Sequence, residues 1–107
     1  MRIITGTARG AVLNTLEGEA TRPTNAKVKE ALFSSIQFDI EGRKVLDLFA
    51  GSGQLGLEAL SRGAEKATFV DSAREATAII TANAQKTHLY IKSSVRRMKW
   101  HITFMKT

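Results

Sequence analysis

The chain of 107 residues contains no cysteine, a single proline and two histidines. Without cysteine there is no disulfide framework, and two histidines lacking cysteine partners argue against a structural zinc site. No apolar run is long enough to span a membrane, and the amino terminus lacks the apolar stretch of a signal peptide. We therefore expect a cytoplasmic protein with no metal ligands and no membrane partner.

Acidic residues are missing from one end of the chain. Residues 1–85 hold all 10 acidic residues and 10 of the 16 basic ones, whereas residues 86–107 hold six basic residues and no acidic one. The net charge of +6 therefore belongs to residues 86–107. Clustered lysine and arginine replace counterions on phosphate, so this tail is a candidate nucleic-acid-binding arm, and the alternative is an accident of truncation.

Pro23 separates two differently patterned parts of the chain. Before it, residues 2–5 and 11–13 are short β-prone runs divided by glycines, which predicts an irregular hairpin or two short extended pieces. After it, apolar residues recur at three-to-four-residue spacing and predict a helix from about Thr24 to Gln37, with Thr24 as its cap.

The next pattern is strand, glycine loop and helix. Residues 44–49 form a compact apolar run between Gly42 and Gly51, which is typical of a buried parallel strand. Good helix formers then fill residues 55–62, and Gly63 supplies the left-handed stop.

The same order begins again at residue 67. Residues 67–71 predict a second buried strand, and Ser72 with Glu75 forms a capping-box pattern that opens a helix ending near Gln85. Such a β-α-β-α series builds a parallel sheet with flanking helices, so the predicted class is α/β.

A glycine-rich loop joins the first predicted strand to its helix. Residues 51–56 read Gly-Ser-Gly-Gln-Leu-Gly, which fits the G-x-G-x-x-G pattern, and Asp71 follows twenty residues after Gly51. Glycines let a backbone turn sharply and approach a ligand, and a carboxylate at the next strand's end accepts hydrogen bonds from ribose hydroxyls. The pattern predicts a nucleoside cofactor; the alternative is a tight turn with a solvated Asp71.

The sign of the nearby charge bears on which cofactor binds. Asp47 ends the first predicted strand, four residues before Gly51. A carboxylate there would repel the pyrophosphate of a dinucleotide but attract the amino acid end of S-adenosylmethionine. Asp47 therefore favours the methyl donor, while a capping role for its carboxylate on the loop amides is compatible with that function.

Residues 45–53, Val-Leu-Asp-Leu-Phe-Ala-Gly-Ser-Gly, resemble the first motif of Rossmann-like methyltransferases. Further blocks lie before and after this motif, in order and without a gap. Together they resemble the RsmD family of ribosomal RNA guanine-N2 methyltransferases over residues 1–85, the amino-terminal half of that family. The blocks are Arg2-Ile3-Ile4-Thr5-Gly6, Arg9-Gly10, Thr21-Arg22-Pro23-Thr24, Val28-Lys29-Glu30-Ala31-Leu32-Phe33, Leu57-Glu58-Ala59-Leu60-Ser61-Arg62-Gly63-Ala64 and Phe69-Val70-Asp71.

This resemblance implies a Rossmann-like methyltransferase fold that transfers a methyl group from S-adenosylmethionine to guanine N2 of small-subunit (16S) ribosomal RNA or its assembly particle. The residues it implies for cofactor binding are Asp47, Phe49, Gly51, Ser52, Gly53, Gly56 and Asp71, with Thr21, Pro23 and Thr24 in a segment that closes over the cofactor. The candidate RNA phosphate contacts are Arg2, Arg9, Arg22 and Lys27, with Lys29 beside them, and a solvated surface role is an equal alternative for each.

The chain departs from the family on the substrate side. The family's chemistry uses an Asn or Asp followed by Pro-Pro and an aromatic residue, and this tetrad is not in the sequence, so no catalytic residue is assigned. The family also places an acidic residue after its third strand for the adenine amine, where this chain has Arg96 and Arg97.

We expect residues 1–107 to form a single incomplete domain, with an amino-terminal extension (1–23), a cofactor-binding core (24–85) and a diverging basic tail (86–107). A truncated or frame-shifted product is the simplest account; a short variant whose Tyr90, Trp100 and Phe104 stack on RNA is the alternative.

Missing strands would leave an open sheet edge, which predicts self-association. Two other functions remain open from the sequence, a non-catalytic cofactor- or RNA-binding remnant and a fragment of an NAD-dependent oxidoreductase.

Overall fold

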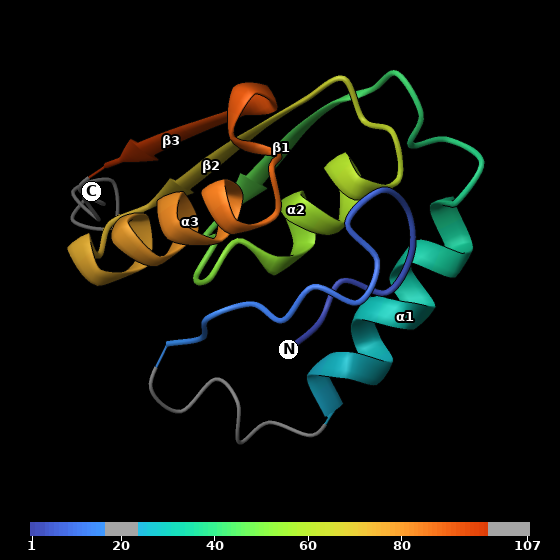
Figure 1. The fold of residues 1–107 in the computed structure, drawn as a ribbon, viewed down its shortest axis with the longest axis horizontal. Helices are drawn as coiled ribbons and strands as arrows, with labels where there is room; N and C mark the ends of the chain where they lie inside the picture. Colours follow the sequence, from blue (N-terminus) through green and yellow to red (C-terminus); the bar gives the residue numbers. More distant parts are fainter. Residues whose placement is uncertain (17–23, 99–107) are drawn as a thin grey trace, which may run out of the picture.

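The computed structural model of the chain describes residues 1–16 and 24–98. Its strands form one parallel sheet in the order β1-β2-β3, with Leu46 opposite Thr68 and Phe69 opposite Val95 (Figure 1). This confirms the predicted α/β class. The elements in chain order are α1 (Thr24–Ile36), β1 (Lys44–Leu48), α2 (Gln54–Ser61), β2 (Lys66–Asp71), α3 (Arg74–Lys86), the 3₁₀ turn η2 (Tyr90–Lys92) and β3 (Ser93–Arg97).

The core lies between one face of the sheet and the helices α2 and α3, which share that side of the sheet in Figure 1. Because side chains alternate across a strand, Ala67 and Phe69 of β2 both point to this face, and both are fully buried. Helix α2 packs against β1 and β2, and α3 packs against β2 and β3. Phe69 therefore lies at the centre of the core.

Strand β1 is only half buried, which differs from the buried strand that its apolar run predicts. Val45 and Asp47 face α2, whereas the side chains of Leu46 and Leu48 are 62% and 52% exposed on the other face. Their exposure has a structural reason: β1 is an edge strand in the described sheet, and helices α2 and α3 cover only one face. The second strand is buried as predicted at Ala67, Phe69 and Val70.

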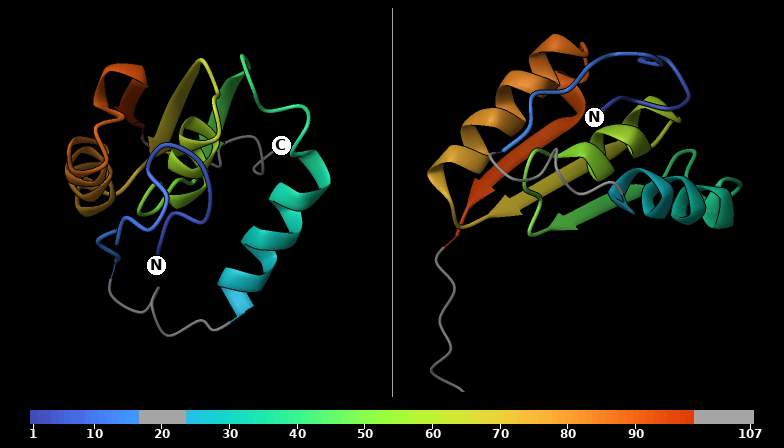
Figure 2. Two further views of the ribbon diagram at one scale, coloured as in Figure 1. Left: turned by 45° about the vertical axis from the view of Figure 1, so that its right-hand side comes forward. Right: turned by 90° about the horizontal axis from the view of Figure 1, so that it is seen from below.

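The amino-terminal residues form the predicted irregular hairpin. An isolated antiparallel bridge joins Arg2 to Val12, and the Ile3 amide donates to the Ala11 carbonyl at 3.0 Å. Ile3 and Leu13 insert into the core, so the hairpin is packed against the helices rather than extended into solvent (Figure 2).

One local prediction differs from the structure, and one strand has no counterpart in the sequence analysis. The capping box of Ser72 and Glu75 is wrong: the N-cap of α3 is Ala73, without a side-chain capping bond, and the Ala73 amide donates instead to the Asp71 carboxylate at 2.9 Å. Strand β3 was not among the predicted elements, because Ser-Ser-Val-Arg-Arg lacks the apolar run by which the other strands were found.

None of the helices within residues 1–16 and 24–98 combines the length and the apolar character needed to cross a membrane. The last nine residues of the tail, which include Trp100 and Phe104, lie outside the described part of the chain.

Candidate functional site

The glycine loop, residues 51–56, follows β1 at the carboxyl end of the sheet, and its last three residues are the start of α2. Gly51 and Gly53 have φ angles of 60° and 82°, a left-handed backbone that favours glycine. Gly56 serves a different purpose, because a Cβ atom at that position would lie 2.3 Å from Cε1 of Phe69. The first two glycines thus shape the loop, and the third lets α2 pack closely against β2.

Two carboxylates hold the ends of this loop from the strands on either side. Oδ2 of Asp47, at the end of β1, accepts a hydrogen bond from the Gly56 amide at 3.1 Å. Oδ2 of Asp71, at the end of β2, accepts one from the Gly51 amide at 3.0 Å. The carboxyl ends of parallel neighbouring strands lie at the same edge of a sheet, so both acids and the loop form one site.

Burial raises the pKa of the Asp47 carboxyl from its ordinary value of 3.8 to about 6, and the nearby charge of Asp71 adds to this rise. The hydrogen bond from Gly56 acts in the opposite direction without cancelling it. Asp47 is only 7% exposed, so its carboxylate is poorly hydrated. A buried carboxylate with little compensation attracts a cation and repels an anion such as pyrophosphate.

Phe49 lies between the two acids in the chain and has an unusual backbone. Its φ angle is 55°, which is uncommon for a residue with a side chain, and its ring is 70% exposed. A strained backbone of this kind persists where the surroundings fix it, often at a binding site. Phe49 thus combines an uncommon backbone with a largely exposed side chain directly before the glycine loop.

Asn83 on α3 is a site residue that the sequence analysis missed. Its Nδ2 donates to the carbonyl oxygen of Ser52 at 2.9 Å, and both residues are completely buried. The sequence contains an indication of this role: Asn83 follows Ala76 and Ile80 on the buried face of α3, where an apolar residue is the norm. A polar residue on such a face must find hydrogen-bond partners.

Glu58 on α2, also missed, anchors the amino-terminal hairpin. Its carboxylate accepts hydrogen bonds from the amides of Ile4 (2.8 Å) and Thr5 (3.0 Å), and it pairs with Lys29 (3.1 Å) and Arg62 (2.9 Å). Burial acts to raise the pKa of Glu58, but these donors together hold it below its ordinary value. The carboxylate is therefore ionised and joins the hairpin, α1 and α2.

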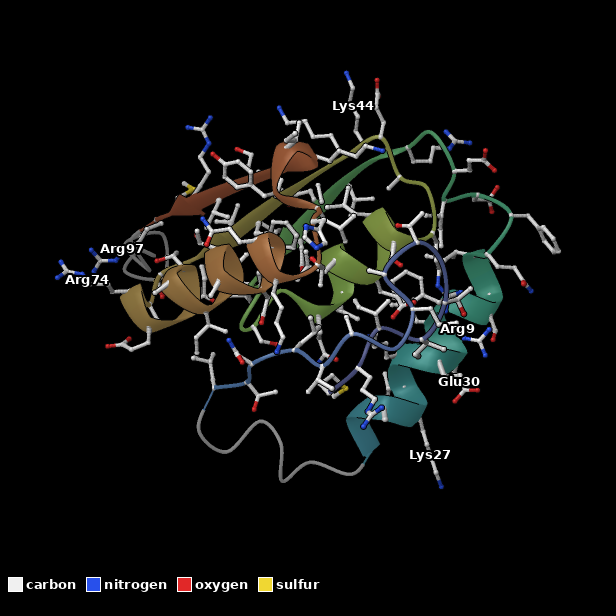
Figure 3. All side chains as sticks on the ribbon, viewed as in Figure 1. Arg9, Lys27, Glu30, Lys44, Arg74 and Arg97 are labelled. Atoms are coloured by element: carbon white, nitrogen blue, oxygen red, sulfur yellow. The ribbon has the colours of Figure 1, made fainter. Side chains whose placement is uncertain are left out.

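Lys29 is consequently not an RNA contact. Its side chain is 1% exposed, and its ammonium group donates to the Arg2 carbonyl at 3.0 Å as well as to Glu58. Both roles considered for Lys29, an RNA contact and a solvated surface residue, are wrong, because the side chain is buried and its charge is paired inside the fold. Arg2, Arg9 and Lys27 are exposed, and Figure 3 shows Arg9 and Lys27 on the α1 side of the molecule.

Several predicted contacts cannot be placed. Thr21, Arg22 and Pro23 lie outside the described residues, and so does the side chain of Thr24, the first residue of α1. At the far end of the site, Arg97 of β3 lies opposite Asp71 and donates to the Ser72 carbonyl at 3.0 Å. Where the resemblance implies an acidic residue for the adenine amine, this chain thus has an exposed arginine.

A cavity of about 330 Å³ lies on the α1 side of Asp47. Apart from Asp47, Asp39 and Arg43, its lining is apolar or glycine, with Phe33, Leu55 and Ala59 among the contributors. A mostly apolar lining of this kind favours an apolar group over a charged one. Within the two described ranges, no three histidine, aspartate or glutamate side chains gather to hold a metal ion.

The chain is similar in sequence to proteins named as ribosomal RNA methyltransferases. The chain is 44% identical over 97 residues to "Putative rRNA methyltransferase YlbH" of Bacillus subtilis, covering 91% of this chain and 53% of that protein. It is 51% identical over 71 residues to "Ribosomal RNA small subunit methyltransferase D" of Haemophilus influenzae, covering 66% and 37%. The chain thus spans about half the length, or less, of these curated relatives.

Solved structures give the same assignment. "Putative methyltransferase yhhF" of Escherichia coli superposes with a TM-score of 0.82 at 38% identity, over 92% of this chain and 53% of that one. A second structure, titled "a putative methyltransferase complexed with SAH", gives a TM-score of 0.57 at 26% identity, over 75% of this chain and 20% of that one. The profile of the family described as "Conserved hypothetical protein 95" matches residues 1–107. The chain belongs to this family, the RsmD family of Rossmann-like methyltransferases.

Proposed function

We propose that this chain is the cofactor-binding part of an S-adenosylmethionine-dependent methyltransferase that acts on guanine N2 of small-subunit ribosomal RNA. The observation that carries the proposal is the pair of carboxylates, Asp47 and Asp71, bonded to opposite ends of one glycine loop. The site is negatively charged where a dinucleotide would place its pyrophosphate. It suits a nucleoside that carries a cationic amino acid end.

The carboxylates retain acceptors for such a ligand. Each oxygen of Asp71 accepts one backbone hydrogen bond, from Gly51 or Ala73, and each has a second lone pair for a ribose hydroxyl. Among the described residues Asp47 accepts one bond, through Oδ2, which leaves Oδ1 for an ammonium group. The residues present therefore fit S-adenosylmethionine, which supplies the methyl group when bound.

The other predicted cofactor residues complete this assignment. The close backbone of Gly51, Ser52, Gly53 and Gly56 would border the methionine part, and Phe49 would border the nucleoside. We assign Thr21, Pro23 and Thr24 to the segment that closes over the ligand. When bound, S-adenosylmethionine would supply the methyl group, and the contribution of these residues would be to hold and orient it.

The names of the relatives support a ribosomal RNA substrate, either free or in an assembling small subunit. Arg2, Arg9, Arg22 and Lys27 are the proposed phosphate contacts on the α1 side, and the cytoplasm is the proposed location. Pro23 is the sole proline, so the Pro-Pro tetrad that holds the target base is not part of these 107 residues. This favours cofactor binding without methyl transfer as the behaviour of the chain by itself.

Transfer of a radiolabelled methyl group from S-adenosylmethionine to 16S ribosomal RNA and to small-subunit particles tests the proposal, with binding of the labelled cofactor measured in the same samples. We expect the purified chain to bind the cofactor, and Asp71→Ala to bind it at least about tenfold more weakly, since hydrogen bonds to a charged group contribute about 1.5–3 kcal/mol.

Glu65→Gln is the matched control, because Glu65 is an exposed carboxylate just before β2, at the opposite end of the strand from Asp71. N2-methylguanosine in the RNA would extend the proposal from binding to catalysis. Equal binding by Asp71→Ala and the wild-type chain would contradict the site.

A further inference from the structure

A single buried side chain, Asn83 of α3, connects the glycine loop to the amino-terminal hairpin. Its Oδ1 accepts a hydrogen bond from the Asn14 amide at 2.8 Å. Its Nδ2 donates to the Asn14 carbonyl at 2.9 Å and to the Ser52 carbonyl at 2.9 Å. One amide group therefore joins segments that lie 31 and 69 residues away along the chain.

The chemistry of this position is specific to an amide. Asn83 is completely buried, and it has to serve one N–H donor and two carbonyl acceptors in different segments. Asparagine supplies one acceptor oxygen and two donors, so every polar group in this cluster is satisfied. An aspartate would place a second acceptor against two carbonyl oxygens, and an alanine would leave all three backbone groups without this partner.

The two segments matter because of where each leads. Ser52 lies inside the glycine loop, whose ends are fixed by Asp47 and Asp71, so the bond from Asn83 fixes its middle. Asn14 lies at the end of the hairpin, two residues after the Arg2–Val12 bridge, so the bonds from Asn83 fix that end. Asn83 thus holds the end of the hairpin against the loop of the proposed cofactor site.

We propose that Asn83 is a positioning residue that couples cofactor binding at the glycine loop to the ordering of the amino-terminal hairpin. This rests on the proposed cofactor site. Coupling between two sites is reciprocal. A ligand that fixes the loop should therefore slow amide exchange in the hairpin, and loosening the hairpin at Asn14 should lower the affinity for the ligand. Glu58 and Ser61 also hold the hairpin, through residues 4–8, but among the described residues neither side chain bonds to the loop.

Ser61→Ala is therefore the matched control. The Ser61 hydroxyl accepts from the Ala8 amide at 2.9 Å and donates to the Thr5 carbonyl at 2.7 Å, and the side chain is buried like that of Asn83. Its loss loosens the hairpin without touching the loop. A merely structural role for Asn83 would give the two variants the same effect on ligand affinity.

The experiment is a calorimetric titration of the full chain with S-adenosylhomocysteine, beside amide hydrogen exchange followed by NMR. We expect Asn83→Ala and Asn83→Asp to bind about tenfold more weakly and Ser61→Ala to bind within about twofold of wild type. Without ligand, Asn83→Ala should speed exchange at Asn14 and at Gly53 together. Ser61→Ala should speed it only in the hairpin.

Wild-type protein gives a readout that does not depend on a variant folding. Saturation with S-adenosylhomocysteine should slow exchange of the Asn14 amide, and unchanged exchange there would overturn the coupling. Equal loss of affinity in Ser61→Ala and Asn83→Ala would overturn it as well. If the wild-type chain binds no S-adenosylhomocysteine, the proposed function fails, and the exchange pattern of ligand-free Asn83→Ala still decides the coupling: faster exchange at only one of Asn14 and Gly53 refutes it.

Discussion

Replacing Asp47 with asparagine should stabilise the free protein while it weakens the cofactor site. The folded protein raises the pKa of this carboxyl from 3.8 to about 6, chiefly through burial. Such a rise means that ionised Asp47 disfavours the fold by roughly 3 kcal/mol at neutral pH. Asparagine keeps an oxygen for the Gly56 amide and carries no charge, so the variant escapes this penalty.

The sign of the pH dependence follows from the direction of the pKa. A carboxyl whose folded pKa is raised binds its proton more tightly when folded, so wild-type stability falls as pH rises from about 4 to about 6. Below that window Asp47 is neutral in both states, and the variant and wild type should be about equally stable. Above it, the variant should be more stable by a constant amount.

Urea unfolding followed by circular dichroism at several pH values between 4 and 8 measures this difference. Glu65→Gln, at an exposed carboxylate, is the control and should follow the wild type throughout. Binding of S-adenosylhomocysteine to Asp47→Asn should weaken by about 10- to 100-fold, since the ammonium loses a charged partner. A variant that is less stable than wild type at pH 7, or a difference that does not change with pH, would refute the reasoning.

Two further predictions concern packing within the fold, and a third concerns self-association of the chain. Glu58→Ala should lower the free energy of unfolding by about 3–5 kcal/mol in chemical denaturation, because it leaves Lys29 buried without its partner, whereas an unchanged midpoint would mean that the cluster is dispensable. Gly56→Ala should destabilise by about 1–3 kcal/mol through contact with Phe69, and Phe69→Leu in the same chain should restore part of the melting temperature, a rescue whose absence would argue against the contact. Leu46→Lys should reduce self-association in sedimentation velocity, because Leu46 is 62% exposed on the open face; a wild-type chain that is monomeric at high concentration would contradict this.

The elements found from the sequence are those whose patterns are local. Helix α1 was predicted over residues 24–37 and ends at Ile36, and β2 was predicted over residues 67–71 and begins one residue earlier. Apolar spacing, glycine stops and the order of the blocks decide these elements within a few neighbouring residues. The glycine loop was predicted for the same reason: Gly51 and Gly53 have the left-handed backbone of a tight turn, and Gly56 allows close packing on Phe69.

What the sequence did not predict depends on contacts between distant segments. Nothing near Glu58 in the sequence indicates that it anchors the hairpin, because that role depends on the Ile4 amide, 54 residues away. Strand β3 is held by pairing with β2 rather than by an apolar run of its own, so its pattern gave no signal. The exposure of Leu46 likewise depends on which elements cover the sheet, which no local pattern can state.

The most direct test of the cofactor site is a calorimetric titration of the purified chain with S-adenosylhomocysteine, with NAD titrated under the same conditions. The carboxylates at the two ends of the glycine loop predict saturable binding of S-adenosylhomocysteine, weakened in Asp71→Ala, and no binding of NAD. Binding of NAD in preference, or no binding of S-adenosylhomocysteine by the folded chain, would contradict the account.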